Sequence, residues 1–285
     1  MRVRLAVILA CVLAGPAVLA QSTRSGFIKT SDGIRIHYLE AGSGRPIVLI
    51  PGWTMPAWIW QQQIDEFSRK YHVISVDPRS QGESEKPSFG HLPETRARDY
   101  KELVDQLGLK QPVLVGWSMG TAELVKYVAQ FGNDNVAGLV FVDGFLQDQF
   151  SPEMFNAMSG WMNQLQQDRT KQADGFVRHM FKKPQPEEYI QKLIAASTQV
   201  PANTAALLIY NMMAVKDYPD GLARVNRPVL CMYQPESQPV ADLVKAKLGD
   251  KVKLARFGDD GHALFVDDPK RFNKLLEEFM QGLPQ

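Results

Sequence analysis

A serine between two glycines gives the strongest chemical signal in the sequence. Ser118 is the centre of the pentad Gly-Trp-Ser-Met-Gly at 116–120, which follows an apolar stretch at 112–115 and precedes a helical pattern at 119–131. In a Gly-x-Ser-x-Gly turn between a strand and a helix, the glycines remove steric clashes and the strained turn exposes the serine hydroxyl at the helix N-terminus. We therefore predict Ser118 to be a catalytic nucleophile, and a purely structural turn is the alternative.

A serine hydroxyl is a poor nucleophile unless a base accepts its proton, so one histidine must lie near Ser118. Of the five histidines, His262 alone follows a predicted late strand, at 252–257, and precedes the last predicted helix, at 269–281. This position brings it to the same carboxyl edge of a sheet as Ser118, and His262 is the predicted base. None of the other four has a histidine partner at the spacing of a metal site, and no metal is predicted.

The elements that must position these residues alternate along the chain. Apolar stretches that predict strands lie at 34–39, 46–50, 73–76, 112–115, 136–142, 228–233 and 252–257, and helical patterns lie at 57–70, 94–107, 119–131 and 269–281. Strands that alternate with helices indicate an α/β fold whose mostly parallel sheet is covered by helices on both faces.

The interval 144–226 breaks this alternation, because it contains helical segments and no convincing strand. We interpret it as a helical cap inserted between the two parts of the core, 21–143 and 227–285. Several apolar side chains share one helical face at its start, and four of them are predicted to bind substrate: Met154, Met158, Trp161 and Met162. Thioethers adapt to varied ligand shapes, although the same face could simply pack on the core.

The N-terminal segment 1–20 has two arginines, a short apolar run and a small-residue end, which is typical of a secretory signal cut after Ala20. The sequence therefore predicts a periplasmic or secreted protein without a stable membrane anchor. The net charge of +1 and the absence of a basic run give no support to nucleic-acid binding. The expected partner is a small molecule, with an apolar group that suits the cap.

Taken together, these features resemble the serine-nucleophile branch of the α/β-hydrolase fold family. The resemblance rests on Leu-Ile-Pro-Gly-Trp at 49–53, Asp-Pro-Arg-Ser-Gln-Gly-Glu-Ser at 77–84, the pentad at 116–120, and Gly-His at 261–262. With Glu123 and Tyr127 on the following helix, the pentad is also similar to bacterial esterases often labelled non-haem peroxidases or perhydrolases. The resemblance implies an α/β-hydrolase fold with an inserted helical cap, and chemistry that needs no metal or organic cofactor.

The resemblance also implies an oxyanion hole made by two backbone N–H groups, those of Met119 and Trp53. The chain departs from the family pattern at two nearby places. Pro51-Gly52 stands where His-Gly is usual, and Arg-Ser-Gln-Gly at 79–82 stands where Arg-Gly-x-Gly is usual. Neither change removes a backbone donor.

The acid that orients His262 is not in its usual place in the family. The loop after the strand at 228–233 normally ends in Gly-x-x-Asp, and here Ser237 occupies the aspartate position. Two substitutes are available, Asp143 at the end of the strand 136–142 and Glu236 in the loop itself. Some family members place the acid after the earlier strand, so we favour Asp143 and keep Glu236 as the alternative.

The sequence thus predicts a serine esterase that cleaves a carboxylic ester through an acyl-enzyme. Lactone opening, perhydrolysis and amide cleavage use the same intermediate, and the sequence does not separate them. A non-catalytic ligand-binding protein of the same fold also remains open.

Overall fold

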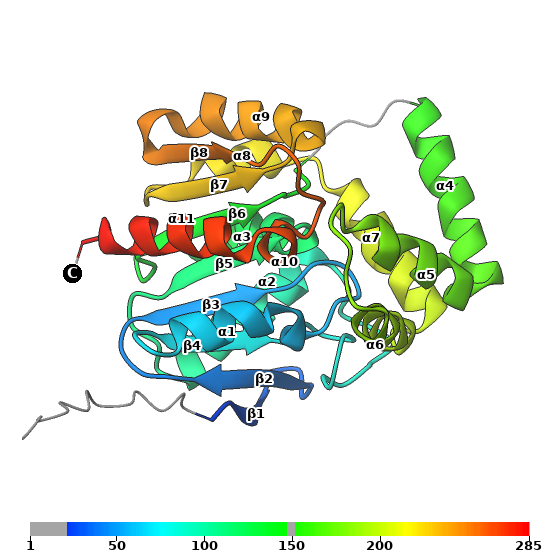
Figure 1. Cartoon of the computed structure of the whole chain (residues 1–285), viewed down its shortest axis with the longest axis horizontal. Helices are drawn as coiled ribbons and strands as arrows, with labels where there is room; N and C mark the ends of the chain where they lie inside the picture. Colours follow the sequence, from blue (N-terminus) through cyan, green and yellow to red (C-terminus); the bar gives the residue numbers. More distant parts are fainter. Residues whose placement is uncertain (1–21, 147–151, 285) are drawn as a thin grey trace, which may run out of the picture.

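One mixed sheet forms the centre of the molecule, whose computed structural model describes residues 22–146 and 152–284 (Figure 1). The sheet has eight strands in the order β1-β2-β4-β3-β5-β6-β7-β8. The pairs β1–β2 and β2–β4 are antiparallel and the others are parallel. The strands are β1 (Arg24–Lys29), β2 (Arg35–Ala41), β3 (Pro46–Ile50), β4 (His72–Val76), β5 (Val113–Trp117), β6 (Gly138–Val142), β7 (Val229–Tyr233) and β8 (Val252–Arg256). The predicted mostly parallel sheet is confirmed.

The apolar pattern predicts seven of these strands and misses β1. This strand lies at the edge of the sheet, and Ile28 is its one buried residue. Strands β3, β5, β6 and β7 are instead buried along their whole length, which explains their uninterrupted apolar runs.

Helices cover both faces of the sheet, as predicted. One buried apolar cluster includes side chains of α2, α3, α8 and α9, and the other includes side chains of α1, α10 and α11. The bounds of these elements are η1 (Ala57–Trp60), α1 (Gln61–Phe67), α2 (Pro93–Gln106), α3 (Met119–Phe131), α8 (Tyr218–Ala223), η2 (Pro235–Ser237), α9 (Gln238–Leu248), η3 (Gly249–Lys251), α10 (Leu264–Asp267) and α11 (Pro269–Gln281).

The described part of the interval 144–226 contains helices and no strand. Its first four helices are α4 (Pro152–Gln167), α5 (Arg169–His179), α6 (Glu187–Thr198) and α7 (Ala202–Ala214), and Figure 1 shows them together at one end of the sheet. The last, α8, packs against α3 of the core. We use the word cap below for α4 to α7.

The segment expected to be a signal peptide, 1–20, lies outside the described residues. Within 22–146 and 152–284, no helix combines the length and apolar character needed to cross a bilayer.

Candidate active site

Ser118 occupies a strained turn between β5 and α3. Its backbone has φ 56° and ψ −117°, a left-handed value of φ that non-glycine residues rarely adopt. Such a conformation costs about 1–3 kcal/mol and persists only where the surrounding structure enforces it. The turn leaves the Ser118 side chain partly exposed at the start of α3.

The two glycines of the pentad are required by space. A Cβ at position 116 would lie 2.5 Å from the carbonyl oxygen of Gly120, and a Cβ at position 120 would lie 2.9 Å from that of Ile50. Neither approach is compatible with a side chain. The chain therefore turns tightly enough to lift the Ser118 hydroxyl only because both positions are glycine.

An apolar cavity of about 500 Å³ opens at Ser118 and receives residues from both the core and the cap. The core contributes Ser118, His262, Asp143, Met119 and Trp53 to its lining. The remaining lining residues are Gly144, Phe145, Ala157, Met158, Trp161, Phe176, Ile209, Met212 and Ser237. All five predicted catalytic and oxyanion residues thus lie around one cavity.

His262 and Asp143 form a hydrogen-bonded pair at this cavity. The Nδ1 atom of His262 lies 2.6 Å from Oδ2 of Asp143, and the carboxylate is fully buried while the imidazole is 25% exposed. The other carboxylate oxygen accepts the backbone N–H of Gln234 at 3.1 Å. With Nδ1 directed at Asp143, Nε2 is the nitrogen that can exchange a proton with a ligand or with Ser118.

Glu236 lies in a different environment from Asp143. Its side chain is 64% exposed, and its Oε1 is 3.5 Å from Nζ of Lys182. Of the two carboxylates left open by the sequence, the structure brings Asp143 to His262.

Cys231 is buried in β7 near this pair. Burial, together with the charge of Asp143, raises the pKa of its thiol to about 12. The group therefore remains a protonated thiol at neutral pH, as expected of a small core residue.

The loop that carries Trp53 packs directly against Ser118. A Cβ added to Gly52 would be 3.0 Å from Cβ and 3.5 Å from Oγ of Ser118. Met119 is the first residue of α3, where backbone N–H groups have no partner within the helix. Among the turn and loop hydrogen bonds of the described residues, neither the Met119 nor the Trp53 N–H has a backbone acceptor.

The Trp53 side chain is anchored in the cap. Its Nε1 donates to the carbonyl oxygen of Ala205 on α7 at 2.8 Å. Its ring lies 5.1 Å from that of Trp161 and 4.9 Å from that of Phe176, measured between centroids. The cap thus contacts the predicted oxyanion loop through an aromatic cluster.

The four predicted cap residues have different positions. Met158 and Trp161 line the cavity, whereas Met162 lines a separate surface hollow between α4 and α7. Met162 is thus not among the residues that line the cavity at Ser118, and its predicted contact with substrate stays a prediction. The Met154 side chain lies outside the described part of the structure.

Sequence patterns miss several lining residues that come from distant elements. Phe145 follows β6, Phe176 lies on α5, and Ile209 and Met212 lie on α7. Each is an ordinary apolar residue of a loop or an amphipathic helix. No local signal distinguishes a residue that faces a cavity from one that faces a neighbouring helix.

A second group of hydrogen-bonded Ser, His and Asp side chains lies near the β1 edge of the sheet. Oγ of Ser25 is 2.8 Å from Nε2 of His37, whose Nδ1 is 2.7 Å from Asp77. Asp77 also accepts the backbone N–H groups of Ala57 and Glu83, so its carboxylate holds two loops together. Ser25 lies within an edge strand, and none of the three lines the cavity. Hydrogen bonding alone therefore does not make an active site here.

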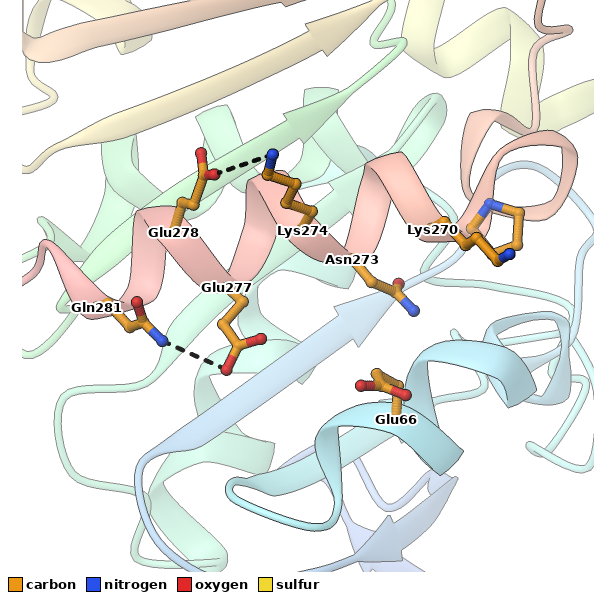
Figure 2. A pocket seen from close by; sticks show the side chains of 8 residues that line it. Glu66, Lys270, Asn273, Lys274, Glu277, Glu278 and Gln281 are labelled. Atoms are coloured by element: carbon orange, nitrogen blue, oxygen red, sulfur yellow. Dashed lines mark hydrogen bonds and ion pairs between the residues drawn. The ribbon is translucent and has the colours of Figure 1, made fainter.

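Another hollow, of about 400 Å³, lies along α11 and faces Glu66 of α1 (Figure 2). Its side chains interact with one another: Lys274 is 3.9 Å from Glu278, and Gln281 donates to Glu277 at 3.4 Å. The lining contains no serine, cysteine or histidine. It offers no chemistry comparable to that of the cavity at Ser118.

Comparison with known proteins shows which family and which structures the chain is similar to. A family model described as "Alpha/beta hydrolase family" matches residues 47–275. The chain is 26% identical over 271 residues to a non-heme chloroperoxidase of Kitasatospora aureofaciens, which covers 88% of this chain and 98% of that protein. It is 24% identical over 259 residues to a pimeloyl-acyl-carrier-protein methyl ester esterase of Vibrio campbellii, which covers 86% of this chain and 98% of that one. A solved esterase from Exiguobacterium antarcticum is similar with a TM-score of 0.83 and 25% identity over 90% of this chain and 99% of that one.

Proposed function

Because the chain belongs to the alpha/beta hydrolase family, we propose that it is a serine hydrolase that cleaves carboxylic esters through an acyl-enzyme. The observation that carries the proposal is the grouping of Ser118, His262 and Asp143 around one apolar cavity, with the imidazole and the carboxylate 2.6 Å apart. The similarity to an esterase structure supports the same choice. Hydrolases of this fold that act on epoxides need an aspartate nucleophile. Here the residue in the turn between β5 and α3 is Ser118.

The reaction proceeds in two steps, acylation of Ser118 and hydrolysis of the acyl-enzyme. Oγ of Ser118 attacks the ester carbonyl carbon while Nε2 of His262 accepts the hydroxyl proton, and the backbone N–H groups of Met119 and Trp53 bind the resulting alkoxide. The carbonyl re-forms, the bond to the alcohol oxygen breaks, and His262 returns the proton to the departing alcohol. Water then repeats the sequence on the acyl-enzyme and releases the acid. Asp143 holds the imidazole and stabilises its cationic form.

The cavity favours a small substrate with an apolar group. Its lining is dominated by aromatic and thioether side chains, and its volume of about 500 Å³ lies within the range of small-molecule sites. The polar lining groups cluster at Ser118 and His262, so the ester group would meet the core and the apolar group would meet the cap.

The test of this function uses purified protein, a panel of p-nitrophenyl esters and a fluorophosphonate probe. We expect ester turnover, and we expect the probe to label Ser118 stoichiometrically, as located by peptide mass mapping. A protein that binds esters but neither turns them over nor reacts with the probe would be a ligand-binding member of the fold. Hydrogen peroxide, lactones and amides tested in parallel would identify the preferred acceptor and acyl donor.

The cap residues that line the cavity are expected to govern specificity. Replacing Met158 or Trp161 with alanine removes contacts with the apolar group and leaves the charge that develops at the carbonyl untouched. The ratio of kcat/KM between short-chain and long-chain esters should change by about tenfold or more, and with it the ranking of the esters. Met162→Ala is the matched control, because Met162 belongs to the same helix but lines the separate hollow. An unchanged ranking in the first two variants would assign the cap face to packing alone.

We also propose that the protein is exported, and the mature chain is expected to begin at Gln21. The support is the charge, apolar run and small-residue end of the segment 1–20. Intact-mass measurement of protein recovered from the periplasm or the medium checks it. Recovery of a chain that still carries Met1 would contradict the cleavage.

A further inference from the structure

A chain of buried polar side chains connects the helix that follows Ser118 to the loop that carries Trp53. Glu123 lies on α3, Arg96 lies on α2, and Gln81 lies in the loop after β4; each is at most 1% exposed. Nε of Arg96 is 2.7 Å from the Glu123 carboxylate, and its Nη2 donates to Oε1 of Gln81 at 2.9 Å. Buried charges of this kind persist only where each has a partner.

The last member of this series of side-chain contacts is the Gln81 amide, which contacts the main chain of the predicted oxyanion loop. Its Nε2 donates to the carbonyl oxygen of Gly52 at 3.0 Å and to that of Met55 at 2.8 Å. These two carbonyls flank Trp53, the residue with one of the two proposed oxyanion donors. The side chain therefore spans the short segment whose N–H must stay directed at the substrate.

The charge of Arg96 determines which way the Gln81 amide points. A guanidinium has only donors, so the amide oxygen must face Arg96 and the NH₂ group must face the loop. Glu123 in turn fixes Arg96, and Tyr100 donates a hydrogen bond to Glu123. Burial is the main cause that raises the pKa of Tyr100, and the negative charge of Glu123 adds to it. The phenol therefore stays protonated and can donate the hydrogen bond.

The loop that carries Trp53 and the segment that carries Gln81 each contain a residue in an unfavourable backbone conformation. Thr54, next to Trp53, has φ 57°, and Ser80, next to Gln81, has φ 71°. Non-glycine residues adopt such values when other contacts enforce them. The two hydrogen bonds from Gln81 join these strained segments to each other, and Thr54 is additionally 2.8 Å from Ser197 through its hydroxyl.

We propose that Gln81 is a positioning residue for the oxyanion hole, held in place by the Arg96–Glu123 pair. The pair links the loop that carries the Trp53 donor to α3, whose first residue carries the Met119 donor. Gln81 does not touch substrate; it sets where the Trp53 N–H lies relative to Ser118. This inference rests on the proposed function, because it assumes that an oxyanion forms at Ser118.

The test compares Gln81→Glu and Gln81→Met with wild type. The glutamate keeps a partner for Arg96 but loses the NH₂ donor, and the methionine keeps most of the volume but loses both contacts. We expect kcat for a p-nitrophenyl ester to fall about 10- to 100-fold in both variants, with KM changed little, because loss of a whole oxyanion donor costs about 10²–10³ in kcat. Binding of an arylboronic acid, which mimics the tetrahedral intermediate, should weaken by the same factor as kcat/KM.

The matched control is Gln63→Met. Gln63 is also a fully buried glutamine whose amide donates to a main-chain carbonyl, that of Phe265 at 3.0 Å, but its hydrogen-bond partners among the described residues, Phe265 and Asn273, lie outside the oxyanion loop. We expect this control to lower Tm while kcat and boronate affinity stay close to wild type. Variants at Gln81 that lose kcat without a matching loss of boronate affinity would overturn the inference, as would wild-type kcat in Gln81→Glu.

The inference and the proposed function can fail separately. Wild-type protein without ester turnover or fluorophosphonate labelling would refute both. Wild-type turnover with unaltered kcat and boronate affinity in Gln81→Glu would refute only the role of Gln81. If Gln81→Glu does not fold, Gln81→Met decides by the same two measurements.

Discussion

Ester turnover is expected to fall by about 10⁴-fold or more when Ser118 is replaced by alanine, because alanine has no hydroxyl with which to form the acyl-enzyme. Alanine adopts the same backbone conformation as serine with the same strain, so the turn and the fold should survive. The variant should also lose fluorophosphonate labelling. The measurements are kcat on a p-nitrophenyl ester, probe labelling by intact mass, and Tm.

Ser25→Ala is the control that this chain itself supplies. Ser25 belongs to a Ser–His–Asp chain with distances of 2.8 and 2.7 Å, yet it lies on an edge strand away from the cavity. We expect the variant to keep wild-type turnover and labelling. If labelling survived in Ser118→Ala and disappeared in Ser25→Ala, the nucleophile would be Ser25 and the assignment of Ser118 would be wrong.

Replacing Asp143 with asparagine is expected to lower turnover by about 10⁴-fold, the loss seen when the corresponding change leaves a serine-protease histidine in the wrong tautomer. Asp143 is fully buried and has φ 43°. Asparagine is among the residues that best tolerate this left-handed conformation, so the backbone should be retained. The expected result is a large loss of kcat with little change in Tm.

Glu236→Gln is the matched control for the acid. Glu236 is exposed and pairs with Lys182, so its replacement should leave turnover within about twofold of wild type, in line with the small energy of surface ion pairs. A large loss in Glu236→Gln with a mild effect in Asp143→Asn would move the acid to the loop after β7. Mild effects in both would indicate a Ser–His dyad.

The positions of Ser118 and His262 could be predicted because each is tied to a local pattern. A strand, two glycines and a helix specify the turn at Ser118, and a histidine between the last strand and the last helix must lie at the same sheet edge. The apolar runs of the buried strands were equally informative. The edge strand β1 was not predictable in this way, since one buried residue, Ile28, makes no pattern.

The remaining site features depend on tertiary geometry. Asp143 and Glu236 are both carboxylates near strand ends, and only the turn after β6 brings one of them to His262. Met158 and Met162 share a helical face in the sequence pattern, yet Met158 lines the cavity and Met162 lines the hollow between α4 and α7. The role proposed for Gln81 has no sequence signal, because this residue stands at the variable position of the usual Arg-Gly-x-Gly pattern and its contacts join segments far apart in the chain.

The hydrogen bond between the Trp53 indole and the carbonyl oxygen of Ala205 ties the loop with one proposed oxyanion donor to α7 of the cap. Any swing of α7 away from the sheet must either break this hydrogen bond or pull the Trp53 segment along with it. A shift of α7 that kept this hydrogen bond would therefore also move the Trp53 N–H relative to Ser118, so the position of a cap helix and the geometry of the proposed oxyanion hole are coupled.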